Sequence, residues 1–281
     1  MIIDAHHHLW RLSRGDYGWL TPDLASLWRD FEPADLAPLM AVGGVAGGIL
    51  VQAAPTNAET AFLLDLAGRA PAILGVVGWT DMAARDAPEA IGRLAADPAL
   101  KGLRPMLQDL ADDDFILTPE VEPALRAIGA AGLRFEALVR PRHLSRLVTV
   151  REHHPDLPII LNHAGKPDIA GGAWSPWAEN IHALAADGIT VCKLSGLITE
   201  AGPGWDADRL RPYADLVIDA FGPDRVMWGS DWPVALLAGN YDRWLAATQR
   251  LLERLTPSER AAILGETAAR VYGLELGGQG L

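Results

Sequence analysis

The sequence is poor in cysteine and in long apolar runs. Its 281 residues include one cysteine, Cys192, so no internal disulfide can form and nothing calls for an oxidising compartment. The longest run of glycine and apolar residues, 40–51, is too short to cross a bilayer. The N-terminal segment has no basic region followed by a long apolar stretch, which argues against a signal peptide. We therefore expect a soluble, cytoplasmic protein.

Positive charge is also scarce. The chain has 24 Lys and Arg residues against 36 Asp and Glu residues, a formal net charge of −12. Nucleic acids and anionic membranes are negative and would be repelled, so neither is expected as a partner. Apolar residues make up 49% of the chain, which is typical of a folded globular protein. A small molecule is the expected partner, and the sequence does not indicate an oligomeric state.

Eight short apolar segments alternate with helical patterns, at the spacing of repeated βα units. They are 2–6, 46–52, 73–79, 102–106, 134–139, 159–163, 190–194 and 226–230. Several are apolar at nearly every position, as in a parallel sheet covered on both faces. We predict one α/β domain over residues 1–281, a (β/α)8 TIM barrel. A doubly wound open sheet is the alternative, but the phosphate-binding turns GxGxxG and GxxxxGKS/T are both absent.

Three segments carry signals for the start of a helix. Thr56 and Glu59 have the spacing of a capping box and predict a helix over 58–70. Thr118 followed by Pro119 predicts a helix that begins at the proline. Thr256 followed by Pro257 and Glu259 predicts a C-terminal helix in the same way.

The first connection between a strand and a helix is unusually long. It runs from Trp10 to Glu32 and also carries Tyr17, Trp19 and Trp28. Loops of this length in a compact domain are usually functional or disordered. Two interpretations are equally open here: an ordered aromatic loop over the mouth of the barrel, or a hydrophobic plug that only seals the core.

Histidines and a carboxylate follow the predicted strands at the end where barrel enzymes carry their chemistry. His6 and His8 share one face of the first strand, and His7 points to the other. His163 follows the sixth strand and Asp231 the eighth. Because the first and eighth strands are neighbours in a closed barrel, these groups would converge on a metal-binding or general-base site. Each could instead be a buried residue whose hydrogen bonds are satisfied by its neighbours.

Other polar residues fall near strand ends. They are Gln52, Arg104, Glu136, Arg140, Lys193 and Ser195. Arg104 could hold a carboxylate or carbonyl oxygen of a substrate, or pair with a neighbouring acid. Lys193 could act in covalent catalysis, but a charge partner for a carboxylate or a donor to substrate is the favoured interpretation. We interpret His143, His153, His154 and His182 as surface residues.

With these residues in view, the chain resembles the amidohydrolase superfamily, in the family-2 branch that contains sugar lactonases such as L-fuconolactonase and L-rhamnonolactonase. The matching segments are IDAHHHLW at 3–10, VGW at 77–79, KGLR at 101–104, LVRPRHL at 138–144, NHAGKP at 162–167, CKLSGL at 192–197, FGPDR at 221–225 and GSDWP at 229–233. They span nearly the whole chain in the expected order.

The resemblance implies a hydrolase with a TIM barrel of the metal-dependent type. It maps the metal ligands of the family onto His6, His8, His163 and Asp231, for one divalent ion, Zn or Mn, which the reaction can also do without. Two-metal relatives have a Lys or Glu on the fourth strand and a His on the fifth. Here those strands offer Arg104 and Glu136. Pro105 stands where many relatives have a His.

The leading hypothesis is hydrolysis of a small sugar-acid lactone to the aldonic acid, as for L-fucono- or L-rhamnono-lactone. Asp231 would deprotonate water and His163 would polarise the carbonyl, with His6 and His8 holding the water. The expected substrate contacts are Arg104, Lys193, Trp10, Trp79 and Glu136. A metal-dependent decarboxylase of an aromatic or muconate-type acid is the alternative, and a non-catalytic binding barrel is a second one.

Overall fold

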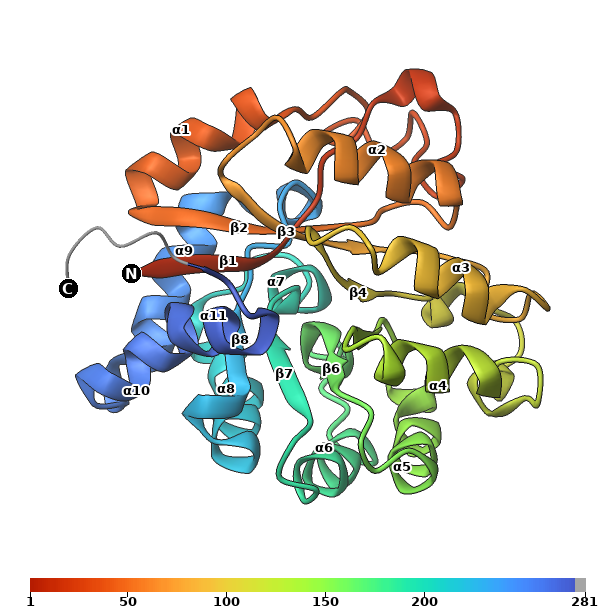
Figure 1. The fold of residues 1–281 in the computed structure, drawn as a ribbon. Helices are drawn as coiled ribbons and strands as arrows, with labels where there is room; N and C mark the ends of the chain where they lie inside the picture. The colour runs from red at the N-terminus through yellow and green to blue at the C-terminus, as the bar shows by residue number, and fades with distance from the viewer. Residues whose placement is uncertain (276–281) are drawn as a thin grey trace.

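Eight parallel strands form the centre of the computed structural model, which describes residues 1–275 (Figure 1). Each strand pairs with the next one along the chain, from β1 to β8. Their bounds are β1 Ile2–His7, β2 Val45–Val51, β3 Ile73–Gly78, β4 Leu100–Leu103, β5 Arg134–Ala137, β6 Ile159–Leu161, β7 Val191–Leu194 and β8 Val226–Trp228. Residues 276–281 of the predicted domain lie outside the described part of the chain. The predicted strand order and (β/α)8 architecture are confirmed.

Four of the predicted strands run two or more residues past the observed carboxyl ends. The segment predicted at 102–106 stops at Leu103, because Pro105 has no N–H with which to continue the ladder. The segment predicted at 159–163 stops at Leu161, because the backbone of His163 turns to a positive φ. Arg104 and His163 therefore stand on the loops that follow β4 and β6.

The barrel closes between β1 and the segment after β8. His8 N donates to Trp232 O at 2.7 Å, and Asp231 N donates to His6 O at 2.7 Å. His7 and Trp232 form a parallel bridge at the same place. The seam thus closes on the residues around Asp231, which brings that carboxylate to the histidines of β1.

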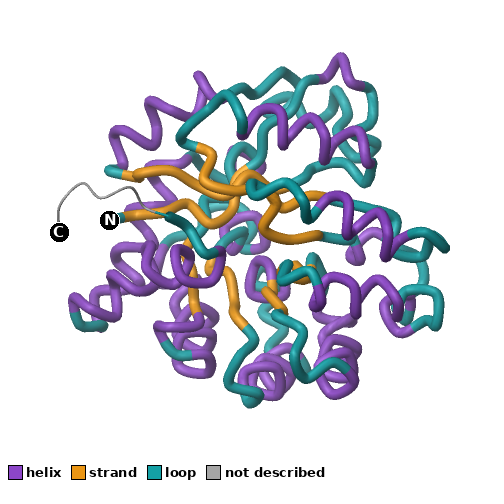
Figure 2. Tube along the Cα trace, viewed as in Figure 1, coloured by secondary structure: helices purple, strands orange, loops and turns teal. Residues whose placement is uncertain are grey.

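Helices pack around the sheet (Figure 2). They are α1 Pro33–Gly43, α2 Asn57–Ala67, α3 Ala87–Leu94, α4 Glu122–Ala130, α5 Leu144–His153, α6 Trp177–Ala185, α7 Leu197–Glu200, α8 Ala207–Phe221, α9 Tyr241–Leu251, α10 Pro257–Ala261 and α11 Thr267–Tyr272. Within residues 1–275, no helix is both long and apolar enough to span a membrane.

The capping predictions have different outcomes. The Thr256 capping box with Glu259 is confirmed at the start of α10. Thr56 caps α2 as predicted, but the Glu59 carboxylate points inward to Tyr17 and the backbone of residue 53, so the box is half formed. The helix predicted after Thr118 forms as α4, but it begins at Glu122 rather than at Pro119, because the chain turns through 119–121 before it.

Apolar residues from six strands meet Ala268 and Tyr272 of α11 in one cluster, so the barrel interior has a hydrophobic floor. A larger core lies between the strands and the surrounding helices. The lone Cys192 is fully buried there, in keeping with the packing role expected for it. Of the polar residues expected near strand ends, Glu136 reaches this floor, where it accepts from the Tyr272 hydroxyl group.

The long first loop is ordered, and it combines both interpretations left open above. Trp10 is fully buried, packs edge-on against Phe31 and Trp19, and seals the core. Trp19 donates its indole N–H to Ala53 O at 2.7 Å, at the mouth of the barrel. Tyr17 ties the loop to α2 by donating to Glu59 at 2.8 Å.

This anchor makes stability depend on pH. Burial raises the pKa of Glu59 to about 7, against the lowering effects of the Ala53 N–H, Tyr17 and Arg14. The folded state therefore binds this proton more tightly than the unfolded chain does. As a result, the free energy of unfolding falls by up to about 3 kcal/mol as pH rises from about 4.5 to about 7. We expect Glu59→Gln to remove this loss, measured by urea unfolding at pH 5 and pH 7.5. If the free energy of unfolding depended on pH equally in the variant and in the parent protein, this role of Glu59 would be contradicted.

Candidate active site

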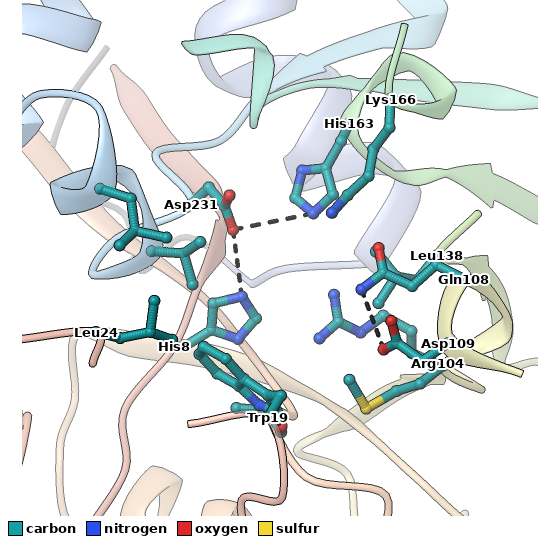
Figure 3. A pocket seen from close by; sticks show the side chains of 14 residues that line it. His8, Trp19, Leu24, Arg104, Gln108, Asp109, Leu138, His163, Lys166 and Asp231 are labelled. Carbon is teal, nitrogen blue, oxygen red and sulfur yellow. Dashed lines mark hydrogen bonds and ion pairs between the residues drawn. The ribbon is translucent and has the colours of Figure 1, made fainter. Parts of the chain in front are cut away.

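A cavity of about 210 Å³ opens at the carboxyl ends of the strands (Figure 3). Its lining combines charged and amide groups with apolar side chains. The lining residues are His8, Trp19, Leu24, Ala53, Arg104, Met106, Gln108, Asp109, Leu138, His163, Lys166, Asp231, Val234 and Leu237.

The structure brings the four predicted site residues together. Asp231 Oδ1 lies 3.3 Å from His8 Nε2, 3.8 Å from His6 Nε2 and 3.9 Å from His163 Nε2. All four side chains are almost completely buried. His7 lies apart from them and lines a second, smaller cavity together with Pro33 and Leu36 of α1. The i, i+2 spacing on β1 thus places two imidazoles on one side of a single carboxylate.

His163 stands in an unusual left-handed turn. Residues 163–166 have φ values of 53°, 50°, 70° and 52°, and Lys166 N donates to His163 O at 2.8 Å. Only one of these residues, Gly165, adopts this conformation without a steric cost, so the turn carries roughly 1–2 kcal/mol of strain at each of the others. The Trp177 indole N–H donates to Ala164 O at 2.7 Å and helps to hold it.

The ring of His163 is fixed from β7. Its Nδ1 lies 2.9 Å from Ser195 Oγ, which leaves Nε2 directed at Asp231. A Cβ on Gly196, which has a φ of +64°, would lie 2.6 Å from the same Nδ1. Glycine at this position therefore lets the chain pass directly behind the imidazole.

Asp4 supports the other side of the site. Its Oδ1 accepts from His6 N at 3.1 Å and from Ser230 N at 2.8 Å, and its Oδ2 accepts from Tyr241 Oη at 3.3 Å. One buried carboxylate therefore joins β1 to the segment that follows β8. Asp231, next to Ser230, has a positive φ of 55°, which turns its side chain into the cavity.

Burial sets the protonation states. It lowers the pKa of His163 to about 3 and that of His6 well below its usual range, helped at His6 by the neighbouring Lys193. Burial acts to raise the pKa of Asp231, but His163 and His8 outweigh it and hold that pKa below its usual value. The site therefore presents neutral imidazoles to an ionised carboxylate, the states that a divalent ion requires.

The contacts of His8 support a cation at this place. Its Nδ1 lies 2.7 Å from Val51 O and must donate to it, so Nε2 of the neutral ring presents a lone pair. That lone pair faces Asp231 Oδ1, also an acceptor, at 3.3 Å. A proton or a metal ion between them resolves the conflict. Ligand atoms on a tetrahedral zinc ion would lie about 3.3 Å apart, given bonds of about 2.0 Å, so these residues fit such an ion.

Two buried cations flank His6. Arg104 Nη1 lies 3.3 Å from its Nε2, and Lys193 Nζ lies 3.4 Å from its Nδ1. Lys193 also pairs with Glu136 at 2.6 Å, with both side chains fully buried. Positive side chains thus occupy the β4 and β7 side of the site, where a second metal ion would be repelled.

Of the five residues expected to contact the substrate, one lines the cavity and four do not. Arg104 lines the cavity, whereas Trp10 lies behind Trp19, away from it. Trp79 lines a neighbouring groove that shares Trp19, Met106 and Asp109 with the cavity. Glu136 and Lys193 lie beneath the site, because Glu136 accepts from Lys193, Asn162 and Tyr272 in a closed internal network.

One residue that was predicted to lie on the surface is buried, which corrects that prediction. His143 is 2% exposed, and its Nδ1 accepts from Arg140 N at 3.1 Å, because the chain turns through 141–143 before α5. Sequence reasoning also missed three cavity residues, Gln108, Asp109 and Lys166, and from the long first loop it named Trp10 rather than Trp19 as a substrate contact. The sequence did offer a signal for Lys166, because it follows His163 within the NHAGKP motif at 162–167.

Comparison with known proteins identifies relatives along nearly the whole chain. A family model described as amidohydrolase matches residues 3–274. An L-fucono-1,5-lactonase from Burkholderia ambifaria is 46% identical, over 97% of this chain and 96% of that protein. A second one, from Burkholderia multivorans, is 39% identical, over 97% and 96%. A crystal structure of an amidohydrolase from Burkholderia multivorans with bound zinc has a TM-score of 0.92 and 39% identity, over 98% of this chain and 100% of that one.

The contact between Gly196 and His163 yields a test. Gly196→Ala should displace the His163 ring and weaken Zn²⁺ binding by roughly 10–100-fold, as loss of orienting contacts does in metal sites. Gly204→Ala is the matched control, because its φ is similar, +71°, and nothing lies within 4 Å of its Cβ. Competition with a chromogenic chelator measures the Zn²⁺ affinity of both variants. Equal zinc affinity in the two variants would contradict this account of the site.

Proposed function

This chain belongs to the amidohydrolase family, and on that premise we propose that it opens a small sugar-acid lactone, L-fucono-1,5-lactone or a close relative, to the aldonic acid. The observation that carries the proposal is the set of imidazoles around the Asp231 carboxylate inside a small, partly polar cavity. The two lactonases described above cover nearly its full length. A cavity of this size and mixed lining suits one sugar ring.

Asp231 is the proposed general base. It is ionised, it borders the cavity, and three imidazoles surround it. Water bound beside it would lose a proton to the carboxylate as the oxygen attacks the lactone carbonyl carbon. The same carboxyl group would then return the proton to the ring oxygen as the ester bond breaks. No other reactant is needed, because hydrolysis consumes only the water.

The histidines position the reacting groups. Nε2 of His8 can accept a hydrogen bond from the attacking water, because its Nδ1 is committed to Val51 O. Nε2 of His163 faces the same space and would polarise the carbonyl oxygen if Nδ1 accepts from Ser195. His6 holds Asp231 from below and is itself held by Lys193 and Arg104.

A divalent ion, zinc or manganese, would be held by His6, His163 and Asp231, whose ligand atoms lie within 4.8 Å of one another, with His8 alongside. Such an ion supplies a Lewis acid that lowers the pKa of bound water and polarises a carbonyl. We propose that at most one ion binds, because Arg104 and Lys193 carry positive charge on the far side of His6.

The alternatives have less support. Decarboxylases are among proteins of similar fold, but at 16–18% identity they show the fold alone. A non-catalytic barrel would not account for a buried carboxylate kept ionised at the cavity wall. A cytoplasmic location and a small-molecule partner, with no nucleic acid or membrane, remain proposals that rest on the single cysteine and the net charge of −12.

Replacement of the proposed base tests the mechanism. Asp231→Asn keeps the size of the side chain but cannot accept the proton, so we expect turnover of an aldonolactone to fall by at least about 10³-fold. A pH-indicator assay with a panel of aldonolactones measures the rate, and circular dichroism checks the fold. Near-normal turnover in the variant would refute the role of Asp231.

Removal of metal tests whether a bound ion activates the water or whether the histidines and Asp231 act without one. The same assay, run after dialysis against a chelator and again after addition of Zn²⁺ or Mn²⁺, reports whether the ion contributes. If the ion activates the water, we expect the rate to fall on chelation and to return on addition. An unchanged rate at verified zero metal content would remove the ion from the mechanism and leave the histidines and Asp231.

A further inference from the structure

The left-handed turn after β6 directs two side chains to the same place. Lys166 N donates to His163 O, an i→i+3 bond, and in a turn with three residues per repeat the side chains at i and i+3 stand above one another. Figure 3 shows Lys166 beside His163, both bordering the cavity. The strained backbone thus presents an imidazole and an ammonium group as a pair.

The conformation of this turn is enforced by its surroundings. Gly165 has a φ of +70°, and a Cβ there would lie 2.8 Å from the Leu144 side chain. Ala164 is fully buried and its carbonyl is held by Trp177. A backbone kept in an unfavourable conformation by packing on both sides is typical of a functional segment.

The other cations of the site are already engaged. Arg104 donates to Gln52 O and contacts His6 Nε2, and Lys193 is paired with Glu136. Lys166 has one loose partner, Glu200, with the nearest N–O distance at 3.7 Å, beyond hydrogen-bond range. Within residues 1–275, no hydrogen bond of its ammonium group is formed. Lys166 is therefore the cation at the cavity wall that can donate to a substrate.

The Lys166 side chain also stands close to the proposed reacting groups. It borders the same cavity as His163 and Asp231, and Figure 3 shows it beside the His163 ring. Its ammonium group is therefore placed to interact with charge that develops between those two side chains. A charge that appears only in the transition state is where a preplaced donor has its greatest effect on rate.

We propose that Lys166 is a catalytic residue that donates a hydrogen bond to the lactone carbonyl oxygen and stabilises the oxyanion; this rests on the proposed lactone hydrolysis. As water attacks the carbonyl carbon and Asp231 takes its proton, the carbonyl π electrons move onto the oxygen, which becomes negative beside the ammonium group. This electron pair re-forms the carbonyl double bond when the bond to the ring oxygen breaks and Asp231 protonates the leaving oxygen. Lys166 keeps its protons throughout.

Lys166→Met tests the proposal, because it retains a long side chain and removes the charge. We expect kcat to fall by about 10²–10³-fold, as for loss of an oxyanion donor, with KM changed less than about threefold. Lys166→Arg should retain more activity than Lys166→Met. Lys166→Ala should regain activity when methylammonium is added. Lys101→Met, near the opposite end of β4 from Arg104, is the matched control and should keep the parental kcat.

Four results would overturn the proposal. A rise in KM with unchanged kcat would make Lys166 a ground-state contact to a hydroxyl group. A loss of kcat without any response to methylammonium and without retention in Lys166→Arg would make it structural. If the parent protein opens no aldonolactone, the proposed function fails and this role fails with it. Parental turnover together with full turnover in Lys166→Met would refute the role of Lys166 alone.

Discussion

The site depends on how the barrel closes at Asp4. This buried carboxylate accepts the backbone N–H groups of His6 and Ser230, and so joins the first strand to the segment after the last one. Backbone hydrogen bonds from His8 and Asp231 complete the seam. Because the seam lies directly beside Asp231 and the histidines of β1, the distance between them is set by strand pairing rather than by flexible side chains. The same contacts close the fold and build the site.

A second constraint is the balance of charge in a dry interior. Ionised Asp231 is buried, and a buried charge is stable only with compensating partners. Neutral imidazoles surround it, and two cations stand behind His6, with Lys193 tied in turn to Glu136. This arrangement supports the proposal that at most one metal ion binds, because positive side chains already stand behind His6. The chain as a whole is acidic, so the cavity is a local exception to its net charge of −12.

Much of the fold was predictable because it depends on local patterns. The eight apolar segments are each long enough to identify, and the cap at Thr256 works with residues adjacent in sequence. The Glu59 prediction fell short because tertiary partners, Tyr17 and the backbone of residue 53, drew the carboxylate away from its cap. The start of α4 was missed because Pro123, not Pro119, lies in its first turn.

The sequence by itself determined which residues could meet: His6, His8, His163 and Asp231 follow strands whose order in a barrel brings them together. Only the tertiary structure decided which way the remaining polar side chains point. Lys193 turns inward to Glu136 and Lys166 turns to the cavity, and Trp19 rather than Trp10 lines the mouth. The reason is physical: side-chain direction depends on partners distant in sequence and on loop backbone, and the positive φ values of 163–166 leave no periodic pattern to detect.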